Sequence, residues 1–493
     1  MEGASLRTVG WQALAGGVIV LLLTGVTLSP GARASALSMQ RLVLVSGPSP
    51  FSPSCAPAFP GETNYFNAEV EPRVAVDPLN AKHIAGVWQQ DRWAFGGALG
   101  LVAGVSWDGG KTWTRSMAAF DRCAGGTPDN GGDYERASDP WVTFAANGDV
   151  YQISISFDAT RATNSVLVSK STDGGEQWSN PTTLILDNGA TFFNDKESIT
   201  GDPHDAQSVY AVWDRSFFPP AGFRDKAFRG PIMFSRTTDG GQTWEKARAI
   251  YDPGRVASTI SNQVAVLPNG DLLDMFARFF PNGALEVDVI RSTDRGVTWS
   301  APVTVGQLQT VSVFDPDTGA PIRTGDIVPD INVDPQSGKV YVVWQDGRFS
   351  EFAHDDIVLS VSSDGGLTWS APIKINQTPI SVPAFTASVS VASDGTVAVT
   401  YYDFRGNTPD PNTLFTDYWI VTCRSSCDDA ASWSSETHIA GPFDMLTAPF
   451  AGGFFVGDYE GLAAVGKGFL AFFVQANSGD LNNPTDVFAA KVA

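Results

Sequence analysis

Acidic and basic side chains recur at matching positions along this chain. Asp and Arg stand close together after several apolar segments, as Asp91-Arg92, Asp214-Arg215, Asp346-Gly347-Arg348 and Asp403-Phe404-Arg405. A guanidinium group is planar and offers paired N–H donors, so it can bind a substrate carboxylate through two hydrogen bonds. Because these pairs recur, the simpler interpretation is a set of structural ion pairs. Residues that break the pattern are better candidates for function, and Arg278, which lacks the Asp, is one of them.

A second set of polar side chains stands where apolar segments with strand character begin. It consists of Glu69, Glu71, Arg73, Asp139, Asp195, Lys196, Glu197, Gln263, Asp330, Asp458, Tyr459 and Glu460. Two carboxyl groups can act as general acid and base on a glycosidic bond, and a Tyr hydroxyl can act as a nucleophile. Either chemistry requires a fold that brings distant parts of the chain together.

A repeated motif indicates which fold does this. The pattern Ser/Thr-x-Asp-x-Gly-x-x-Trp occurs five times, and a degraded copy without the Gly ends at Trp433. In such a motif the Asp carboxylate accepts hydrogen bonds from turn amides, the Gly adopts a positive φ and the Trp packs against a neighbouring unit. A feature present in nearly every unit is structural, so we expect hairpin turns without catalytic residues. The intact copies span 106–113, 171–178, 237–244, 292–299 and 362–369.

Apolar segments before and after each motif complete a repeating unit. An inner-strand pattern recurs, as in residues 72–78, 262–268 and 329–335, and a second and a third strand lead from it into the motif. One further strand after the motif makes a four-stranded antiparallel blade. The sequence therefore predicts an all-β fold, a β-propeller of four-stranded antiparallel blades, with residues 37–493 as a single domain. Equivalent inner-strand positions fall at Arg73, Trp141, Ser198, Gln263, Asp330, Ser388 and Gly461.

The last unit determines the expected number of blades. Residues 459–465, 468–475 and 486–492 supply only three strands and carry no motif. The missing strand can come from Arg41 to Val45 near the N-terminus, which would close the ring. We prefer seven blades because seven units can be counted, and such rings hold four to eight blades. The alternative is a six-bladed ring with an appended C-terminal hairpin.

In a propeller, the inner strands begin at the mouth of the central channel, and the loops after the second strands lie beside it. This arrangement would bring the two sets of polar side chains together. We therefore expect any binding or catalytic site at the channel mouth.

The N-terminal segment resembles an export signal. An apolar run from Trp11 to Leu28 follows Arg7 and leads to the sequence Ala-Arg-Ala-Ser-Ala at residues 32–36, which has the small residues of a cleavage site. We expect residues 1–36 to be a signal peptide and the rest to be secreted, extracellular and not held in a membrane. The alternative is an uncleaved anchor, since the run approaches the length of a spanning helix.

The charge balance narrows the choice of partner. The formal net charge is −21, which gives no electrostatic basis for binding nucleic acid or an anionic membrane. We expect a monomer that binds a glycan or glycoconjugate and needs no cofactor and no metal. Acidic loops such as residues 129–133 could hold calcium, although turn chemistry explains them equally well.

Four cysteines in an exported chain suit two disulfides. We expect Cys423 to bond Cys427, because their spacing closes a tight loop and they flank the motif copy that lost its Gly. Cys55 with Cys123 follows by elimination. Metal ligation is the weaker interpretation, since the histidines show no ligand spacing with these sulfurs.

These repeats resemble the Asp boxes of sialidase-like, BNR-repeat proteins, and the resemblance extends over the whole mature chain. The segments around Arg73 and Arg92 look like the first blade of sialidases, and the segment from Gln263 to Arg278 looks like the one that ends in a clamp Arg. The resemblance implies that Arg73, Arg278 and Arg348 grip a substrate carboxylate, with Arg92 and Gln263 also contacting substrate.

Catalysis in this family needs a Tyr nucleophile activated by a Glu, together with an Asp acid. Tyr459 resembles the nucleophile, but Gln263 stands in the place of the Glu and no acidic residue occupies the usual position in the first blade. Glu197 or Glu460 would then have to supply the base, and Asp91 could replace the acid only if its loop pointed into the channel.

Three hypotheses follow from the sequence. The leading one is a secreted glycoside hydrolase related to exo-α-sialidases that acts on terminal acidic sugars. The second is a non-catalytic extracellular propeller that binds glycan or protein. The third is hydrolysis of a different glycan by two carboxyl groups, with Glu197 and Asp139 as acid and base. Convergence of the three clamp arginines would favour the first, and pairing of each Arg with a local carboxylate would disfavour it.

Overall fold

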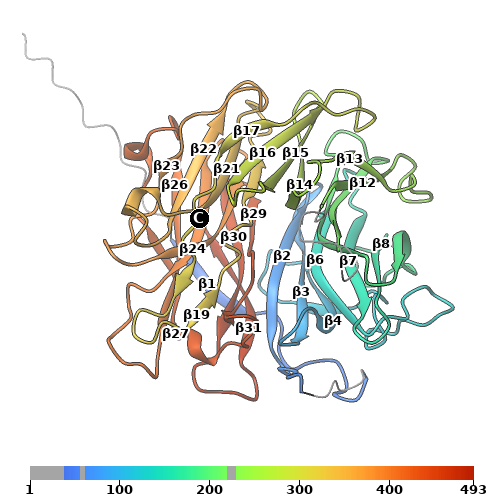
Figure 1. Cartoon of the computed structure of the whole chain (residues 1–493), viewed down its shortest axis with the longest axis horizontal. Helices are drawn as coiled ribbons and strands as arrows, with labels where there is room; N and C mark the ends of the chain where they lie inside the picture. Colours follow the sequence, from blue (N-terminus) through green and yellow to red (C-terminus); the bar gives the residue numbers. More distant parts are fainter. Residues whose placement is uncertain (1–37, 56–60, 219–228) are drawn as a thin grey trace, which may run out of the picture. The chain divides into compact units, whose positions relative to one another are not determined.

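The computed structural model describes residues 38–55, 61–218 and 229–493 (Figure 1). Regular structure in these ranges is β-strand apart from three short 3-10 helices, Arg348–Ser350, Ala430–Ser432 and Met445–Thr447. The prediction of an all-β chain with four-stranded antiparallel sheets is confirmed. The predicted signal peptide lies outside the described residues. Within the described ranges, no helix is both long and apolar enough to span a bilayer.

The first strands form an eight-stranded sheet that divides into two sets of four. Strand pairing joins the two sets at one position, where Ala98 of the first set lies opposite Ala137 of the second. The first set is β2 Glu69–Asp77, β3 Asn80–Arg92, β4 Ala98–Ser106 and β5 Thr114–Ser116, and the second is β6 Arg136–Phe144, β7 Val150–Asp158, β8 Thr163–Ser171 and β9 Thr182–Asn188.

Four further four-stranded sheets follow in chain order, each an antiparallel meander. The first two are β10 Phe192–Gly201, β11 Val209–Phe217, β12 Ile232–Thr237 and β13 Arg248–Tyr251, then β14 Ser258–Val266, β15 Leu272–Phe279, β16 Leu285–Ser292 and β17 Val303–Gln307. The next two are β20 Asp330–Val333, β21 Val340–Asp346, β22 Asp356–Ser362 and β23 Ile373–Lys374, then β24 Ala384–Val391, β25 Val397–Asp403, β26 Phe415–Cys423 and β27 Thr437–Asp444.

The last four-stranded sheet joins the two ends of the described chain. It consists of β29 Gly461–Val465, β30 Gly468–Ala476, β31 Thr485–Val492 and the N-terminal strand β1 Met39–Leu44 (Figure 1). β1 runs antiparallel to β31, with Met39 opposite Val492 and Leu44 opposite Phe488. The prediction that an N-terminal strand completes the last unit is confirmed.

The innermost strands of these sheets lie next to one another in succession. β2 contacts β6, and the contacts continue through β10, β14, β20, β24 and β29 until β29 contacts β2. A cavity of about 440 Å³ is lined by residues from six of these strands, including Val74, Val264, Val333 and Leu462. The inner strands therefore surround a common space.

A small three-stranded sheet has no counterpart in the repeats. It consists of β18 Val313–Phe314, β19 Pro321–Arg323 and β28 Phe454–Phe455. β18 and β19 belong to an insertion between β17 and β20, and β19 pairs in parallel with β28. This pairing holds the residues near position 322 beside β28, which lies just before β29 in the chain.

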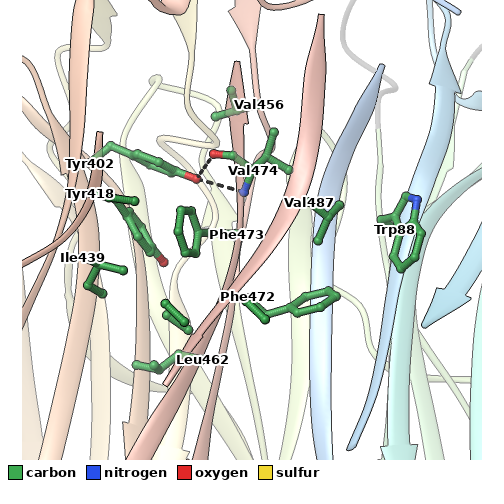
Figure 2. Close-up of a cluster of buried hydrophobic side chains, with 14 of the residues drawn as sticks. Trp88, Tyr402, Tyr418, Ile439, Val456, Leu462, Phe472, Phe473, Val474 and Val487 are labelled. Carbon is green, nitrogen blue, oxygen red and sulfur yellow. Dashed lines mark hydrogen bonds between the residues drawn. The ribbon is translucent and has the colours of Figure 1, made fainter. Parts of the chain in front are cut away.

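The closing sheet packs its aromatic side chains against the sheets on both sides. Figure 2 shows Phe472 and Phe473 of β30 between Tyr402 and Tyr418 on one side and Trp88 of β3 on the other. Tyr402 Oη donates a hydrogen bond to the backbone oxygen of Val474, 2.7 Å away, so its hydroxyl is satisfied inside the core. These contacts fix the last sheet between its neighbours.

The repeated motif forms turns in the manner expected. Asp108 accepts hydrogen bonds from the backbone N–H groups of Lys111 and Thr112 at 2.9 and 3.0 Å, and Ser106 Oγ accepts one from Gly110 N–H. Bonds to the Thr112 backbone and side chain lower the pKa of Asp108 to about 2, so its carboxylate stays ionised and committed to the turn.

The structure contains two disulfides, Cys55–Cys123 and Cys423–Cys427. The first joins the segment after β1 to the long loop between β5 and β6. The second closes the turn between β26 and β27, beside Trp433.

Candidate active site

Two adjoining cavities form the candidate site. One has a volume of about 390 Å³ and is bordered largely by the insertion around β18 and β19, and the other has a volume of about 180 Å³ and is bordered by the starts of β2, β6 and β10. Asp195, Lys196 and Arg323 line both. Any ligand that spans the two cavities must pass these three side chains.

β-Bulges at equivalent places in the inner strands position the charged groups. The register shifts between Val70 and Arg73 in β2, and at the same relative place in β6 and β10. The bulged residues Glu71, Asp139 and Lys196 have φ angles of 54°, 50° and 49°. Non-glycine residues rarely adopt this left-handed conformation, and a bulge redirects a side chain that would otherwise follow the strand alternation. Three successive inner strands thereby direct charged side chains to one place.

Lys196 is the hub of the resulting ion network. Its ammonium nitrogen lies 3.1 Å from Glu71 Oε1, 2.7 Å from Asp139 Oδ1 and 2.8 Å from Asp458 Oδ2. Burial alone would lower the pKa of Lys196, but the three carboxylates outweigh burial and raise it well above its usual value. Lys196 therefore remains protonated and cannot serve as a base.

Arg323 completes the network from the other wall. Its Nε and Nη2 atoms contact the two oxygens of Asp458 at 2.9 and 2.5 Å, a two-bond pairing that guanidinium and carboxylate groups favour. Despite burial, Arg323 and Lys196 hold the pKa of Asp458 well below its ordinary value. Arg323 was not predicted as a site residue, because its insertion has no repeat against which it could be aligned.

Glu71 and Asp195 hold their protons more tightly than Asp458 does. Burial raises the pKa of Glu71 to about 8, against the opposing charge of Lys196. Burial and the nearby charge of Asp139 raise the pKa of Asp195 to about 6. Asp195 is partly exposed and lines both cavities. Near neutral pH the site thus holds carboxyl groups in different protonation states.

The predicted clamp of Arg73, Arg278 and Arg348 does not form around these cavities. None of the three lines either cavity, and each pairs with a nearby carboxylate. Arg73 Nη2 contacts Asp330 Oδ1 at 2.9 Å, and its guanidinium carbon lies 3.5 Å from the centre of the Trp141 ring.

The other two clamp candidates bind carboxylates within their own sheets. Arg278 contacts Asp288 at 2.7 Å and Glu286 at 2.9 Å, both on the adjacent strand β16. Arg348 binds Asp346, two residues before it, at 2.7 Å. In this structure, each of the three arginines of the predicted clamp forms an ion pair of its own.

Arg92 is the predicted substrate-binding residue that does line a cavity, the smaller one. It is 2% exposed and donates a hydrogen bond to Gln89 Oε1 at 2.7 Å, and its guanidinium group lies over the Phe455 ring. Among the described residues, no carboxylate lies within ion-pair distance of it. Gln263 lies away from both cavities, where its Nε2 donates to the backbone oxygen of Pro329.

The four predicted catalytic residues line neither cavity. Tyr459 is 5% exposed and packs against Trp141, and burial raises the pKa of its hydroxyl well above the usual value. Glu197 and Glu460 are buried, and burial likewise raises the pKa of each well above normal. Asp91 accepts hydrogen bonds from Ser49 and from the backbone of Asn67, so its carboxylate does not take the place of the missing acid.

Comparison with known proteins was made on sequence and on structure. Residues 100–320 match the family model of the BNR repeat-like domain. No curated protein matches the chain.

Similar solved structures include a protein of unknown function from Dyadobacter fermentans, with 14% identity over 93% of this chain and 99% of that chain and a TM-score of 0.47. The alpha-L-arabinanase of Penicillium chrysogenum has 13% identity over 74% of this chain and 94% of that chain, with a TM-score of 0.48. A Hadza microbial sialidase has 13% identity over 92% and 94%, with a TM-score of 0.47. Likenesses at this level assign neither a substrate nor an activity.

The family match agrees with the repeats in the sequence. Four of the five intact motif copies lie within residues 100–320, and the fifth, at 362–369, extends the same pattern beyond the matched region. Residues 100–320 are therefore similar to a BNR repeat-like domain, and the repeats in the sequence continue beyond them.

Proposed function

We propose that this protein is a carbohydrate-active enzyme, a glycoside hydrolase whose reaction takes place where the two cavities meet. The observation that carries the proposal is the pair Asp139 and Asp195. Both line the smaller cavity, and the charge of Asp139, together with burial, raises the pKa of Asp195 to about 6. Glycosidases pair a general acid whose pKa is raised in this way with a second carboxyl group.

The two carboxyl groups have distinct roles in the proposed reaction. Asp195 is the general acid and donates its proton to the glycosidic oxygen as the bond to the sugar breaks. Asp139, which pairs with Lys196 at 2.7 Å, acts on the other side of the sugar, where it removes a proton from the attacking water or attacks the sugar itself. Its distance from the reacting carbon decides between these two routes.

The charge balance of the site favours an uncharged sugar over the terminal acidic sugar expected from the resemblance. Lys196 and Arg323 share Asp458 as a partner, and Lys196 also contacts Asp139 and Glu71, so both cations are already paired. Arg92 alone would have to bind a sugar carboxylate. An acidic sugar would also meet the negative charge of Asp139.

The proposed enzyme is a seven-bladed propeller exported from the cell. The closed succession of inner-strand contacts and the pairing of β1 with β31 support seven blades over six. Residues 1–36 are proposed as the signal peptide on their sequence pattern, and the mature protein as an extracellular monomer.

The test is a screen of the purified mature protein against nitrophenyl glycosides of neutral and acidic sugars. Asp195→Asn and Asp139→Asn should each lower kcat/KM by about 100-fold or more on the best substrate, as expected for loss of a general acid or base. Asp410→Asn changes the same chemical group on an exposed turn and should leave the rate unchanged. Hydrolysis that survives both site substitutions would overturn the assignment.

A non-catalytic glycan-binding role is the second candidate. Its specific support is the burial of Tyr459 and the Gln at position 263, which together remove the sialidase type of catalysis. Calorimetric titration with neutral oligosaccharides distinguishes the two roles. Binding without turnover across the whole glycoside screen would establish this candidate in place of the hydrolase.

A further inference from the structure

The larger cavity extends well beyond the two proposed catalytic carboxyl groups. Its volume of about 390 Å³ lies within the range of about 300–1,000 Å³ typical of small-molecule sites. Most of its wall comes from residues 312–328, which lie in the insertion between β17 and β20. The insertion thus forms a second compartment beside the repeated sheets.

Several contacts fix this wall in place. β18 pairs with β19, β19 pairs with β28, and Arg323 binds both oxygens of Asp458. Gly325 has a φ of 62°, and a Cβ atom there would lie 2.0 Å from the backbone oxygen of Asp458. Only glycine allows this close approach, so the insertion rests directly on the ion network.

Phe314 presents an aromatic ring at the edge of this compartment. Side chains alternate along a strand, and Val313 is 2% exposed while Phe314 is 52% exposed and borders the cavity. Because the exposed ring borders the cavity, a ligand in the cavity would cover it, and burying an aromatic ring is favourable.

Asp326 supplies a polar group on the same wall. Its Oδ2 atom accepts hydrogen bonds from Ser312 Oγ at 2.6 Å and Thr310 Oγ1 at 3.2 Å. Its other oxygen, Oδ1, takes no part in these two bonds. A ring face beside a carboxylate acceptor suits a sugar, which offers an apolar C–H face and hydroxyl donors.

We infer that the larger cavity is a second sugar-binding position, which holds the leaving-group sugar of an uncharged oligosaccharide. This inference rests on the proposed function. Asp195 stands between the two compartments, as a general acid must if the sugars on either side of the glycosidic oxygen occupy one compartment each. Phe314 stacks on the leaving-group sugar, and Asp326 accepts hydrogen bonds from its hydroxyl groups.

The test compares substrates with and without a leaving-group sugar. Disaccharides such as lactose, cellobiose, maltose and xylobiose are assayed beside the glycosyl fluoride of the sugar that the screen identifies. Phe314→Ala should lower kcat/KM about tenfold for the disaccharide and leave the fluoride unchanged, because only the disaccharide fills the second position. Phe349→Ala, at an exposed ring that borders neither cavity, is the matched control.

Binding is measured separately so that this inference and the hydrolase proposal can fail independently. Calorimetry on Asp195→Asn, with and without Phe314→Ala, reports disaccharide and monosaccharide affinity in the absence of turnover. A loss confined to the disaccharide supports the second position even if no substrate is hydrolysed.

Equal effects of Phe314→Ala on both substrates, or no effect on either, would overturn the inference while hydrolysis persists. Phe314→Trp keeps an aromatic face and should retain disaccharide activity, which separates lost stacking from misfolding.

Discussion

Protonation at the site depends on Asp195, whose carboxyl group is surrounded by charges of both signs. Burial and Asp139 raise its pKa, whereas Lys196 and Arg323 lower it. The result, about 6, is near the value expected for a general acid that works at mildly acidic pH. Removing any one of these neighbours should therefore move the pH dependence of the enzyme in a definite direction.

We predict that kcat/KM falls as the pH rises above about 6, because the proposed acid must be protonated to react. Arg323→Gln removes a positive charge that favours the ionised form of Asp195, so the pKa of Asp195 should rise. The falling limb of the plot of kcat/KM against pH should then move to higher pH. Rates measured from pH 4 to 9 test this. Arg348→Gln alters an Arg paired elsewhere and should leave the limb in place. A limb that does not move in Arg323→Gln would exclude Asp195 as the titrating acid.

Arg278 has a structural role in the observed arrangement. Asp288 is fully buried and has Arg278 2.7 Å away, so Arg278→Ala leaves a buried carboxylate without its cation. We expect a loss of about 2 kcal/mol in the free energy of unfolding, measured with urea, and no change in sugar affinity by calorimetry. Weaker sugar binding with unchanged unfolding would reverse this assignment and restore Arg278 as a ligand contact.

The sequence identified Arg278 as unusual but could not reveal its partner. Register places Arg278 opposite Glu286, and the strand spacing then brings Asp288 within reach. Sequence repeats align equivalent positions in different sheets, whereas this pairing is between adjacent strands of one sheet. For the same reason the charged residues at the strand starts could be predicted as a set, but the contacts among them could not.

Among the elements, the repeated strands were predictable and the inserted sheet was not. Residues 459–465, 468–475 and 486–492 were expected as strands, and they correspond to β29, β30 and β31. β18, β19 and β28 are two or three residues long, and β19 finds its partner about 130 residues further along the chain. The alternation of apolar and polar residues that marks a strand cannot be recognised in so few residues. For this reason the sequence predicted neither Arg323 as a site residue nor the larger cavity.

The two disulfides close loops of very different length and should stabilise the protein unequally. Cys55–Cys123 spans 68 residues and Cys423–Cys427 spans four. Loop-closure entropy predicts that replacing the first disulfide by two serines lowers the free energy of unfolding by about 4 kcal/mol. The same change at the second disulfide should lower it by about 2 kcal/mol. Guanidinium unfolding of the two double variants measures both losses. Equal losses would mean that strain or residual structure, and not loop length, controls the effect.

Across the whole molecule, buried carboxyl groups make stability depend on pH. Burial raises the pKa of Asp121 to about 7 and that of Asp214 to about 8. Such groups bind protons more tightly in the folded state than in the unfolded state. Their contribution to stability is therefore complete below about pH 4 and is lost as the pH rises towards 7 or 8.

Asp121→Asn isolates one of these contributions. Asp121 is fully buried, and its Oδ1 accepts a hydrogen bond from the backbone of Ala124 that an amide oxygen can also accept. We expect the variant to gain stability over the parent between pH 5 and pH 8, by on the order of 2 kcal/mol or about 3 °C in Tm. Differential scanning calorimetry at several pH values measures this gain. A difference in Tm that is constant with pH would show that Asp121 ionises normally.

The pairing of β1 with β31 also fixes when the molecule can be completed. Met39 pairs with Val492, 453 positions later, so β1 has no place in a sheet until β31 has been synthesised. During that time β1 offers unpaired backbone groups to other chains. Contacts this distant in sequence form slowly. Completion of the last sheet therefore awaits the synthesis of β31, because without β31 the strand β1 has no partner.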